Sequence, residues 1–228
     1  MSVIEMLFYE KCISLNKYKY NYGRQANKTL KDILIPSKIT TKLNEYLLSF
    51  YKEQLKNISS KSFMNKKISL EIKNWKHFEL TNYFDIRKGE RLTVYNRTQD
   101  DNNIPLITAS SENNGVVDFI SYSDFKDEKK LFERKITIDM FFNVFYHSYK
   151  YFSDDNVHTL IPKFKSNKYI SLFLVSVLKN SHYKYSFGRQ ARLNRITKET
   201  IKLPQNNGKP DFEFMENYIK SLPYSSSI

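Results

Sequence analysis

The stretch YKYSFGRQA, residues 183–191, decides how this chain is divided, because YKYNYGRQA occurs earlier at residues 18–26. Seven of the nine positions are identical at an offset of 165 residues. The two differences, Asn21 against Ser186 and Tyr22 against Phe187, are conservative. A segment written twice in this way indicates a duplicated structural unit.

The sequence before and after each copy is also similar. Leu7 and Phe8 stand opposite Leu172 and Phe173 at the same offset, inside apolar stretches that predict a helix leading into the motif. After the motif, each copy passes through a short strand-like stretch to a proline, KDILIP in the first and ETIKLP in the second. The predicted unit is therefore a helix, the motif, a strand and a proline.

A further helix is predicted after each proline. The first helix has two neighbouring apolar faces, and so broad a stripe predicts helix-on-helix packing over about 30 Å. One face consists of Ile39, Leu43, Leu47 and Phe50, and the other of Leu48, Tyr51, Leu55 and Ile58. In the second, Asp211 can cap the N-terminus and Pro223 ends the helical pattern.

The segment from Trp75 to about Lys165 has a different pattern. Short apolar runs alternate with clusters of Asn, Asp, Gly and Ser: IPLITAS, GVVDFISY, KITIDMFFNVFYH and NVHTLIPKF. These are strand and turn signals, and Asn113, Asn114 and Gly115 predict a tight turn. The fold class expected for the chain is α+β, with one mixed domain of short strands and few helices plus the long helices.

Composition restricts the partner and the compartment. The 228 residues carry a formal net charge of +13, which favours a polyanion such as nucleic acid. The single cysteine, Cys12, allows no internal disulfide and predicts a cytoplasmic protein. The longest apolar run, residues 170–178, is far shorter than the roughly 20 residues of a membrane helix, and Glu5 and Glu10 disfavour an export signal.

Enzyme motifs are scarce. The five glycines form no phosphate-binding loop, and the four scattered histidines with one cysteine have no zinc spacing, so no cofactor or metal is expected. Two Glu-x-Lys pairs, at residues 71–73 and 133–135, resemble half of a Mg²⁺ nuclease site. This spacing arises easily in a lysine-rich chain, so we expect no catalytic residues, although a small Mg²⁺ nuclease stays open as an alternative.

Basic and aromatic side chains interleave in three segments. They are Arg87, Lys88, Arg91, Tyr95 and Arg97 in one loop, Tyr146, Tyr149, Lys150 and Tyr151 in another, and Lys184, Tyr185, Arg189, Arg192 and Arg195 in a third. Guanidinium groups bind phosphate or guanine, glutamine pairs with adenine, and aromatic rings stack on bases. The predicted DNA-binding residues are Lys88, Arg91, Arg97, Asn113, Asn114, Tyr149, Lys150, Lys184, Arg189, Gln190, Arg192 and Arg195. A structural alternative is equally open for GRQA, namely a buried turn whose arginine binds a helix C-terminus.

The order of motif, helix, motif and helix resembles the DNA-specificity (S) subunits of type I restriction-modification systems and related type IIB enzymes. The resemblance rests on WKHFELTNYFDIRKGE, IPLITASSENNGVVDFI, ITIDMFFNVFYHSYKYFSDDNVHTLIP, FGRQARLNRITKETIKLP and PDFEFMENYIKSLPYS. It implies target-recognition domains that each read half of a split double-stranded DNA site, and helices that pair antiparallel. It also implies that catalysis belongs to partners: a methyltransferase subunit that binds S-adenosylmethionine, and a restriction subunit.

One departure from this pattern concerns the first copy, since Met1 falls opposite Ser166. Residues 1–36 are then the tail of a truncated first recognition domain, 37–73 a spacer helix and linker, 74–204 a complete recognition domain, and 205–228 a C-terminal helix. We therefore expect a truncated or half-size specificity subunit that either pairs with a second copy through its spacer helices or is a remnant of a longer subunit. The alternative from another class is a stand-alone nucleic-acid-binding accessory protein.

Overall fold

The computed structural model describes residues 3–16, 30–54, 61–93, 104–124 and 130–228. The chain divides into an N-terminal unit, Met1–Ser60, and a C-terminal unit, Lys61–Ser226. Each unit is described by itself. The first copy of the motif, residues 18–26, and Arg97 lie outside the described residues.

The N-terminal unit contains two helices that contact each other, α1 (Val3–Ser14) and α2 (Thr41–Gln54), with a 3₁₀ turn, η2 (Leu30–Asp32), between them in sequence. The helix predicted ahead of the first motif is therefore confirmed. No described side chain of α1 is buried. Of the predicted apolar stripe on α2, Leu48 and Phe50 are exposed, whereas Leu43, Leu47 and Tyr51 are half-buried. Tyr46, which lies outside the stripe, is also exposed.

The strand predicted over KDILIP is wrong. Leu30–Asp32 form η2, and Ile33 to Pro36 have no regular structure. Leu34 is 94% exposed. A strand is stabilised by a neighbouring strand, and the described residues of the N-terminal unit contain no strand with which this stretch could pair.

The C-terminal unit has a four-stranded antiparallel sheet in the order β2-β9-β6-β7. Its strands are β2 (Phe84–Lys88), β6 (Lys135–Asp139), β7 (Val144–His147) and β9 (Val157–Pro162). The central strands β6 and β9 are almost wholly buried. Isoleucine, valine and threonine fill them, as is typical of strands covered on both faces.

A second sheet has the order β4-β3-β8-β5, and within it β3 and β8 run parallel. Its strands are β3 (Ile104–Ile107), β4 (Val116–Ile120), β5 (Leu131–Phe132) and β8 (Tyr151–Ser153). The predicted NNG turn is confirmed as η5 (Asn113–Gly115), in which all three residues have positive φ. The second 3₁₀ turn, η6 (Tyr122–Asp124), follows β4.

Two short ribbons and several turns complete the unit. β1 (Lys76–Glu79) pairs antiparallel with β10 (Thr200–Leu203), so the strand predicted over ETIKLP is confirmed. β11 (Gln205–Asn206) pairs with β12 (Lys209–Pro210). The connecting helical turns are η3 (Ile72–Asn74), α3 (Leu80–Tyr83), η8 (Lys179–Lys184), α5 (Leu193–Ile196) and η9 (Ser225–Ser227).

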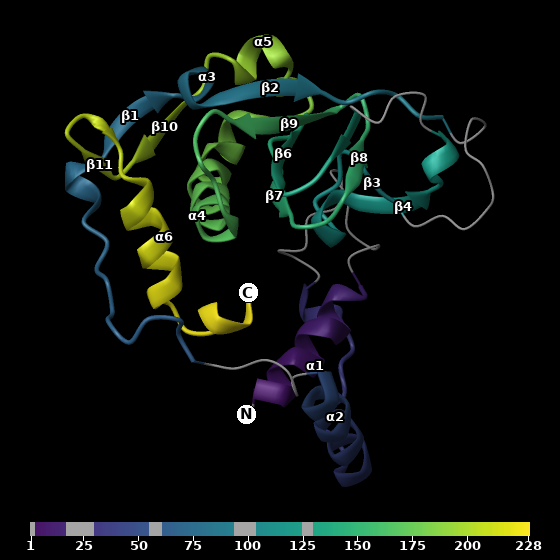
Figure 1. Cartoon of the computed structure of the whole chain (residues 1–228). Coiled ribbons are helices and arrows are strands. Elements are labelled where there is room, and N and C mark those ends of the chain that lie inside the picture. The colour runs from purple at the N-terminus through teal and green to yellow at the C-terminus, as the bar shows by residue number, and fades with distance from the viewer. Residues whose placement is uncertain (1–2, 17–29, 55–60, 94–103, 125–129) are drawn as a thin grey trace. The chain divides into compact units, whose positions relative to one another are not determined.

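Of two longer helices, one packs on the first sheet and the other packs on that helix. α4 (Lys168–Leu178) lies between the sheet and α6 (Phe212–Ser221), as Figure 1 shows. The side-chain oxygen of Asn167 caps α4 by accepting hydrogen bonds from the backbone N–H groups of Tyr169 and Ile170. The side-chain NH₂ of Asn167 donates to Glu216 of α6 at 2.7 Å. Asp211 caps α6 by accepting from the N–H of Phe214, as predicted. α6 thus packs within its own unit, and its pairing with the spacer helix stays a prediction.

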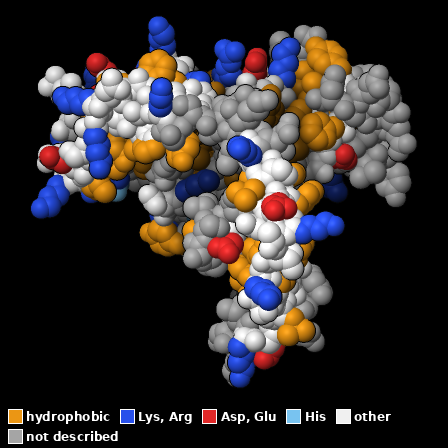
Figure 2. Space-filling model, turned by 90° about the horizontal axis from the view of Figure 1, so that it is seen from below, with side chains coloured by type: hydrophobic (Ala, Val, Ile, Leu, Met, Phe, Trp, Pro, Cys, Tyr) orange, Lys and Arg blue, Asp and Glu red, His pale blue; other side chains and the backbone are white. Residues whose placement is uncertain are grey.

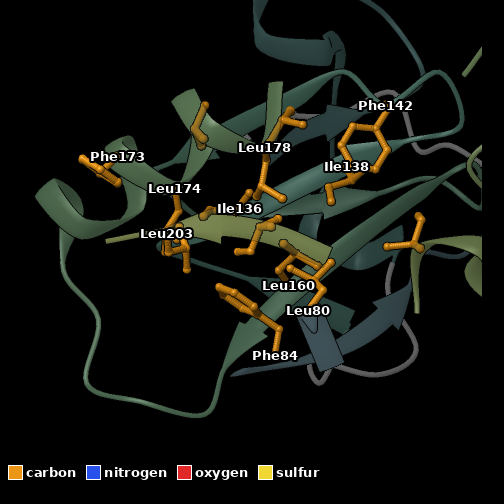
Figure 3. Packing of buried hydrophobic residues seen from close by; sticks show 14 of the residues in the cluster. Leu80, Phe84, Ile136, Ile138, Phe142, Leu160, Phe173, Leu174, Leu178 and Leu203 are labelled. Carbon is orange, nitrogen blue, oxygen red and sulfur yellow. The ribbon is translucent and has the colours of Figure 1, made fainter. Parts of the chain in front are cut away.

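The main core joins helix and sheet. Figure 3 shows Leu174 and Leu178 of α4 directed toward Ile136, Leu160 and the other buried side chains. The mixed α/β class is confirmed, and so are the strands in all four predicted apolar runs. The loop assignments were wrong for four residues. Arg87 and Lys88 end strand β2, Tyr146 lies in β7, and Tyr151 is fully buried in β8, because a tyrosine in a basic segment can still point into the core.

Candidate nucleic-acid interface

The second copy of the motif belongs to a longer basic segment, residues 182–198, which we call the arginine segment. It contains five Lys and Arg residues and no Asp or Glu. Two of its residues, Tyr185 and Ala191, anchor it to the core. Tyr185 stacks on Phe142 with ring centroids 4.8 Å apart and donates its hydroxyl to Glu199. Ala191 is fully buried, and its N–H donates to the carbonyl of Met140 at 2.7 Å.

Between these anchors the chain makes a two-residue turn, the tip hairpin, Ser186 to Arg189. Ser186 and Arg189 exchange backbone hydrogen bonds of 3.2 and 3.0 Å. Phe187 and Gly188 form the turn, and a Cβ built on Gly188 would meet no atom within 4 Å. The buried turn considered for GRQA is wrong, because residues 186–189 are exposed and only Ala191 is buried. A DNA contact by Arg189 stays a prediction.

The next two arginines lie on the surface and are held by backbone or side-chain oxygens. Arg195 donates through Nη1 to the carbonyl of Gln190 at 2.7 Å, and Arg192 donates through Nη1 to Asn156 at 3.1 Å. Each bond uses one of the five donors of the guanidinium group. The position of each arginine is thus fixed while most of its fork can still bind an anion.

Lys88 and Arg192 both lie near the same buried histidine, His158. Lys88 is paired in register with His158, which is 3% exposed. Burial, and to a smaller extent the positive charges of Lys88 and Arg192, lower the pKa of His158 to about 4. Two predicted DNA-binding residues from distant parts of the sequence are thereby brought together around a neutral imidazole.

Other predicted residues have structural contacts. The ammonium group of Lys184 pairs with Glu199 at 2.8 Å, and this ion pair helps to fix the arginine segment. Arg91 lies close enough to Asp154 to lower the pKa of that carboxyl, although burial has the larger effect and raises it. Tyr149 contacts His147 Nδ1 at 3.3 Å through its hydroxyl and is 39% exposed, and Lys150 is exposed beside it.

Asn113 and Asn114 are exposed in η5, which contacts β7. The loop before η5 and the arginine segment line the same surface hollow. A surface hollow of about 510 Å³ separates the loop before η5 from the tip hairpin. It is lined by Ala109, Ser110, Ser111, Phe141, Asn143, His182, Tyr185 and Ser186.

Two exposed aromatic residues were missed by the sequence analysis. Tyr183 and Phe187 are each 82% exposed, the highest values for any described aromatic side chain. Phe187 precedes a glycine in a turn sequence, and this position was a signal that the ring is solvent-exposed. The surface in Figure 2 also shows more Lys and Arg than Asp and Glu.

The residues that suggested a nuclease do not form a described site. Glu71, Lys73 and Glu133 are exposed. Within the described part of the chain, no three His, Cys, Asp or Glu residues lie close enough together to hold a metal ion. A search of the same residues finds no helix with the length and hydrophobicity needed to cross a membrane.

Comparisons with known proteins agree on one family. Residues 72–223 match the type I restriction modification DNA specificity domain. The specificity subunit S.BcgI of a type II restriction enzyme from Heyndrickxia coagulans is 30% identical over 222 residues, which are 93% of this chain and 64% of that protein.

Solved structures with similarity include two specificity subunits. The type I S subunit from M. genitalium has 16% identity and a TM-score of 0.48, and the match covers 96% of this chain. The HsdS subunit from Thermoanaerobacter tengcongensis has 12% identity and a TM-score of 0.49, over 98% of this chain. The chain spans about half the length of each, 48% and 50%. Because the family match covers most of its length, this chain belongs to the type I restriction modification DNA specificity domain family.

Proposed function

We propose that the chain is the DNA sequence-specificity subunit of a restriction-modification system and reads one half of a split site with residues 74–204. The observation that carries the proposal is the arginine segment, because five basic residues without an acidic one lie on a surface anchored to the core. Lys88 adds to this positive surface from β2. Family membership supports the same function.

The proposed division of roles follows from chemistry. Lysines and arginines bind phosphates and give an affinity that falls with salt, whereas base choice needs side chains that reach base edges. Arg91, Arg97, Asn113, Asn114, Tyr149, Lys150, Lys184, Gln190 and Arg195 are proposed as further contacts on the DNA side. Of these, Lys184 is already paired, so we expect its contribution to be small.

Catalysis is assigned to partners. We propose that a methyltransferase subunit binding S-adenosylmethionine docks on this chain, that a restriction subunit joins the complex, and that the complex works in the cytoplasm. The exposed residues of α2 offer a surface on which a second copy of the chain could pair with it.

DNA binding is tested by titrating labelled random-sequence duplex with the purified full chain at several salt concentrations. We expect affinity to fall steeply as salt rises, because several phosphates are neutralised. Absence of binding at low salt would contradict the proposal.

The partner is tested separately by capturing the tagged chain from its native lysate and identifying what is bound by mass spectrometry. We expect a methyltransferase in near-stoichiometric amount. Capture of nucleic acid alone would instead favour an accessory binding protein.

A further inference from the structure

The tip hairpin carries an aromatic ring, Phe187, that does not pack against the rest of the protein. Phe187 is 82% exposed, and the neighbouring Gly188 has open space around it. An apolar ring in this position contributes nothing to the core. Single exposed apolar residues are common on proteins, so exposure alone is not sufficient evidence.

The rigidity of the hairpin is the second observation. On one side, Tyr185 is buried, stacked on Phe142 and bonded to Glu199. On the other, Ala191 is bonded to Met140, and the carbonyl of Gln190 accepts from Arg195. A ring held at the tip of such a support loses little entropy when it inserts into a partner.

The charge around the ring identifies the partner. Arg189, Arg192 and Arg195 follow Phe187 within eight residues, all exposed, and the arginine segment contains no carboxylate. A protein partner would need a strongly acidic surface at this point, whereas DNA supplies phosphates and stacked bases together. Apolar wedges flanked by basic residues unstack base steps and bend the duplex in several DNA-binding folds.

We propose that Phe187 is a wedge that inserts between base pairs of the bound DNA while the neighbouring arginines hold the flanking phosphates. The inference rests on the proposed DNA-reading function and adds the means by which the duplex is deformed. Specificity then arises in part from how easily a given base step opens, without a hydrogen bond from Phe187.

The test compares two labelled duplexes of about 30 base pairs that differ only in one central abasic site, which removes part of the cost of unstacking. Binding of the full chain is measured by fluorescence anisotropy at fixed salt. We expect the wild-type chain to bind the abasic duplex about tenfold more tightly than the intact one. Phe187→Ala should bind both duplexes within about twofold of each other.

Two further variants separate insertion from structure. Phe187→Tyr, which places in the second copy the residue found at Tyr22 of the first, keeps the ring and should keep the preference. Phe119→Ala removes a 51% exposed ring from β4 and should leave the preference unchanged. All variants should unfold at the wild-type urea concentration, since none of these side chains is buried.

The outcomes are distinguishable. If the wild-type chain shows salt-dependent binding but no preference, or if Phe187→Ala retains the preference, the wedge is wrong and DNA binding stands. If Phe187→Ala binds both duplexes like the wild type but no longer captures the methyltransferase, the ring is a protein contact and the wedge is also wrong. If the wild-type chain binds neither duplex, the proposed function and the wedge fail together.

Discussion

The two copies of the repeated unit have similar sequences but different structural outcomes. α4, ahead of the second copy, buries Phe173 and Leu174 against the sheet, whereas α1, ahead of the first, has no buried side chain among those described. ETIKLP forms a strand paired with β1, and KDILIP forms none. A helix can form from local sequence, but a strand and a core depend on what the rest of the chain places beside them.

The largest expected effect comes from the matched phenylalanines Phe173 and Phe8. Phe173 is 3% exposed and lies 5.6 Å from Trp75 between ring centroids, whereas Phe8 is partly exposed. Phe173→Ala should lower the free energy of unfolding of the C-terminal unit by about 3–5 kcal/mol. Trp75, the chain's single tryptophan, reports this transition by fluorescence in urea.

Phe8→Ala is the control, and it should leave the Trp75 transition in place. Equal shifts for the two variants would mean that the two helices are equally important to one cooperative core, and the contrast between the copies would be lost.

The paired strand gives the next largest effect. Leu203 of β10 is 1% exposed, whereas Ile35, which also directly precedes a proline, is 43% exposed. Leu203→Ala should destabilise the C-terminal unit by about 2–4 kcal/mol, because it leaves a cavity, and Ile35→Ala should change stability by about 1 kcal/mol or less. Urea denaturation followed by Trp75 fluorescence and circular dichroism measures both; a large loss for Ile35→Ala would contradict the exposed conformation of KDILIP.

Acid should act on the C-terminal unit, since all four histidines lie after residue 60. Burial lowers the pKa of His147 and of His158 to about 4, below the ordinary value near 6.5. The unfolded chain therefore binds protons that the folded chain excludes between these pH values. Stability contributed by the neutral imidazoles is fully present above about pH 6.5 and is lost as the pH falls toward 4, by about 1 kcal/mol per pH unit for each histidine.

The slope of stability against pH between 4.5 and 6.5 checks this, measured by urea unfolding followed with Trp75. His158→Gln should reduce the slope by about 1 kcal/mol per pH unit, the contribution of one histidine, whatever it does to stability at neutral pH. An unchanged slope would mean that His158 is protonated in the folded state.

Much of the C-terminal unit could be predicted from the sequence because its signals are local. Asp211 is a capping residue at a helix start, Asn114 tolerates positive φ, and short apolar runs mark β3, β4, β6, β7 and β9. Tyr151 of β8 was misplaced because its burial depends on packing against residues of the other sheet, such as His147 of β7, whose ring centroid lies 4.6 Å from that of Tyr151. KDILIP was misassigned because its strand signal gave no information about a pairing partner.

The candidate site was predictable by residue type but not by arrangement. Arginine-rich sequence indicated a polyanion partner, yet only the fold shows that Lys88 and Arg192 share His158, and that Lys184 is occupied by Glu199. Phe187 was omitted because aromatic residues are more often buried than exposed, although its position before a glycine in a turn indicated exposure.

The smallest expected effects concern individual DNA contacts. Arg189→Ala and Arg192→Ala should each weaken binding to duplex about fivefold and lower the dependence of affinity on salt by about one phosphate contact. Lys209→Ala, at an exposed lysine of β12, is the matched control and should change affinity by less than about twofold. Equal effects for all three variants, measured by anisotropy titration, would assign the arginines a structural role only.

The contrast between the proposed reading unit, residues 74–204, and an N-terminal unit whose described residues contain no strand leads to one direct measurement. It is the selection of bound duplexes from a random-sequence library by the purified full chain. The account predicts enrichment of a single short motif, present once or, where two copies pair, as an inverted repeat of that motif. Enrichment of no motif, or of two different motifs by the one chain, would contradict it.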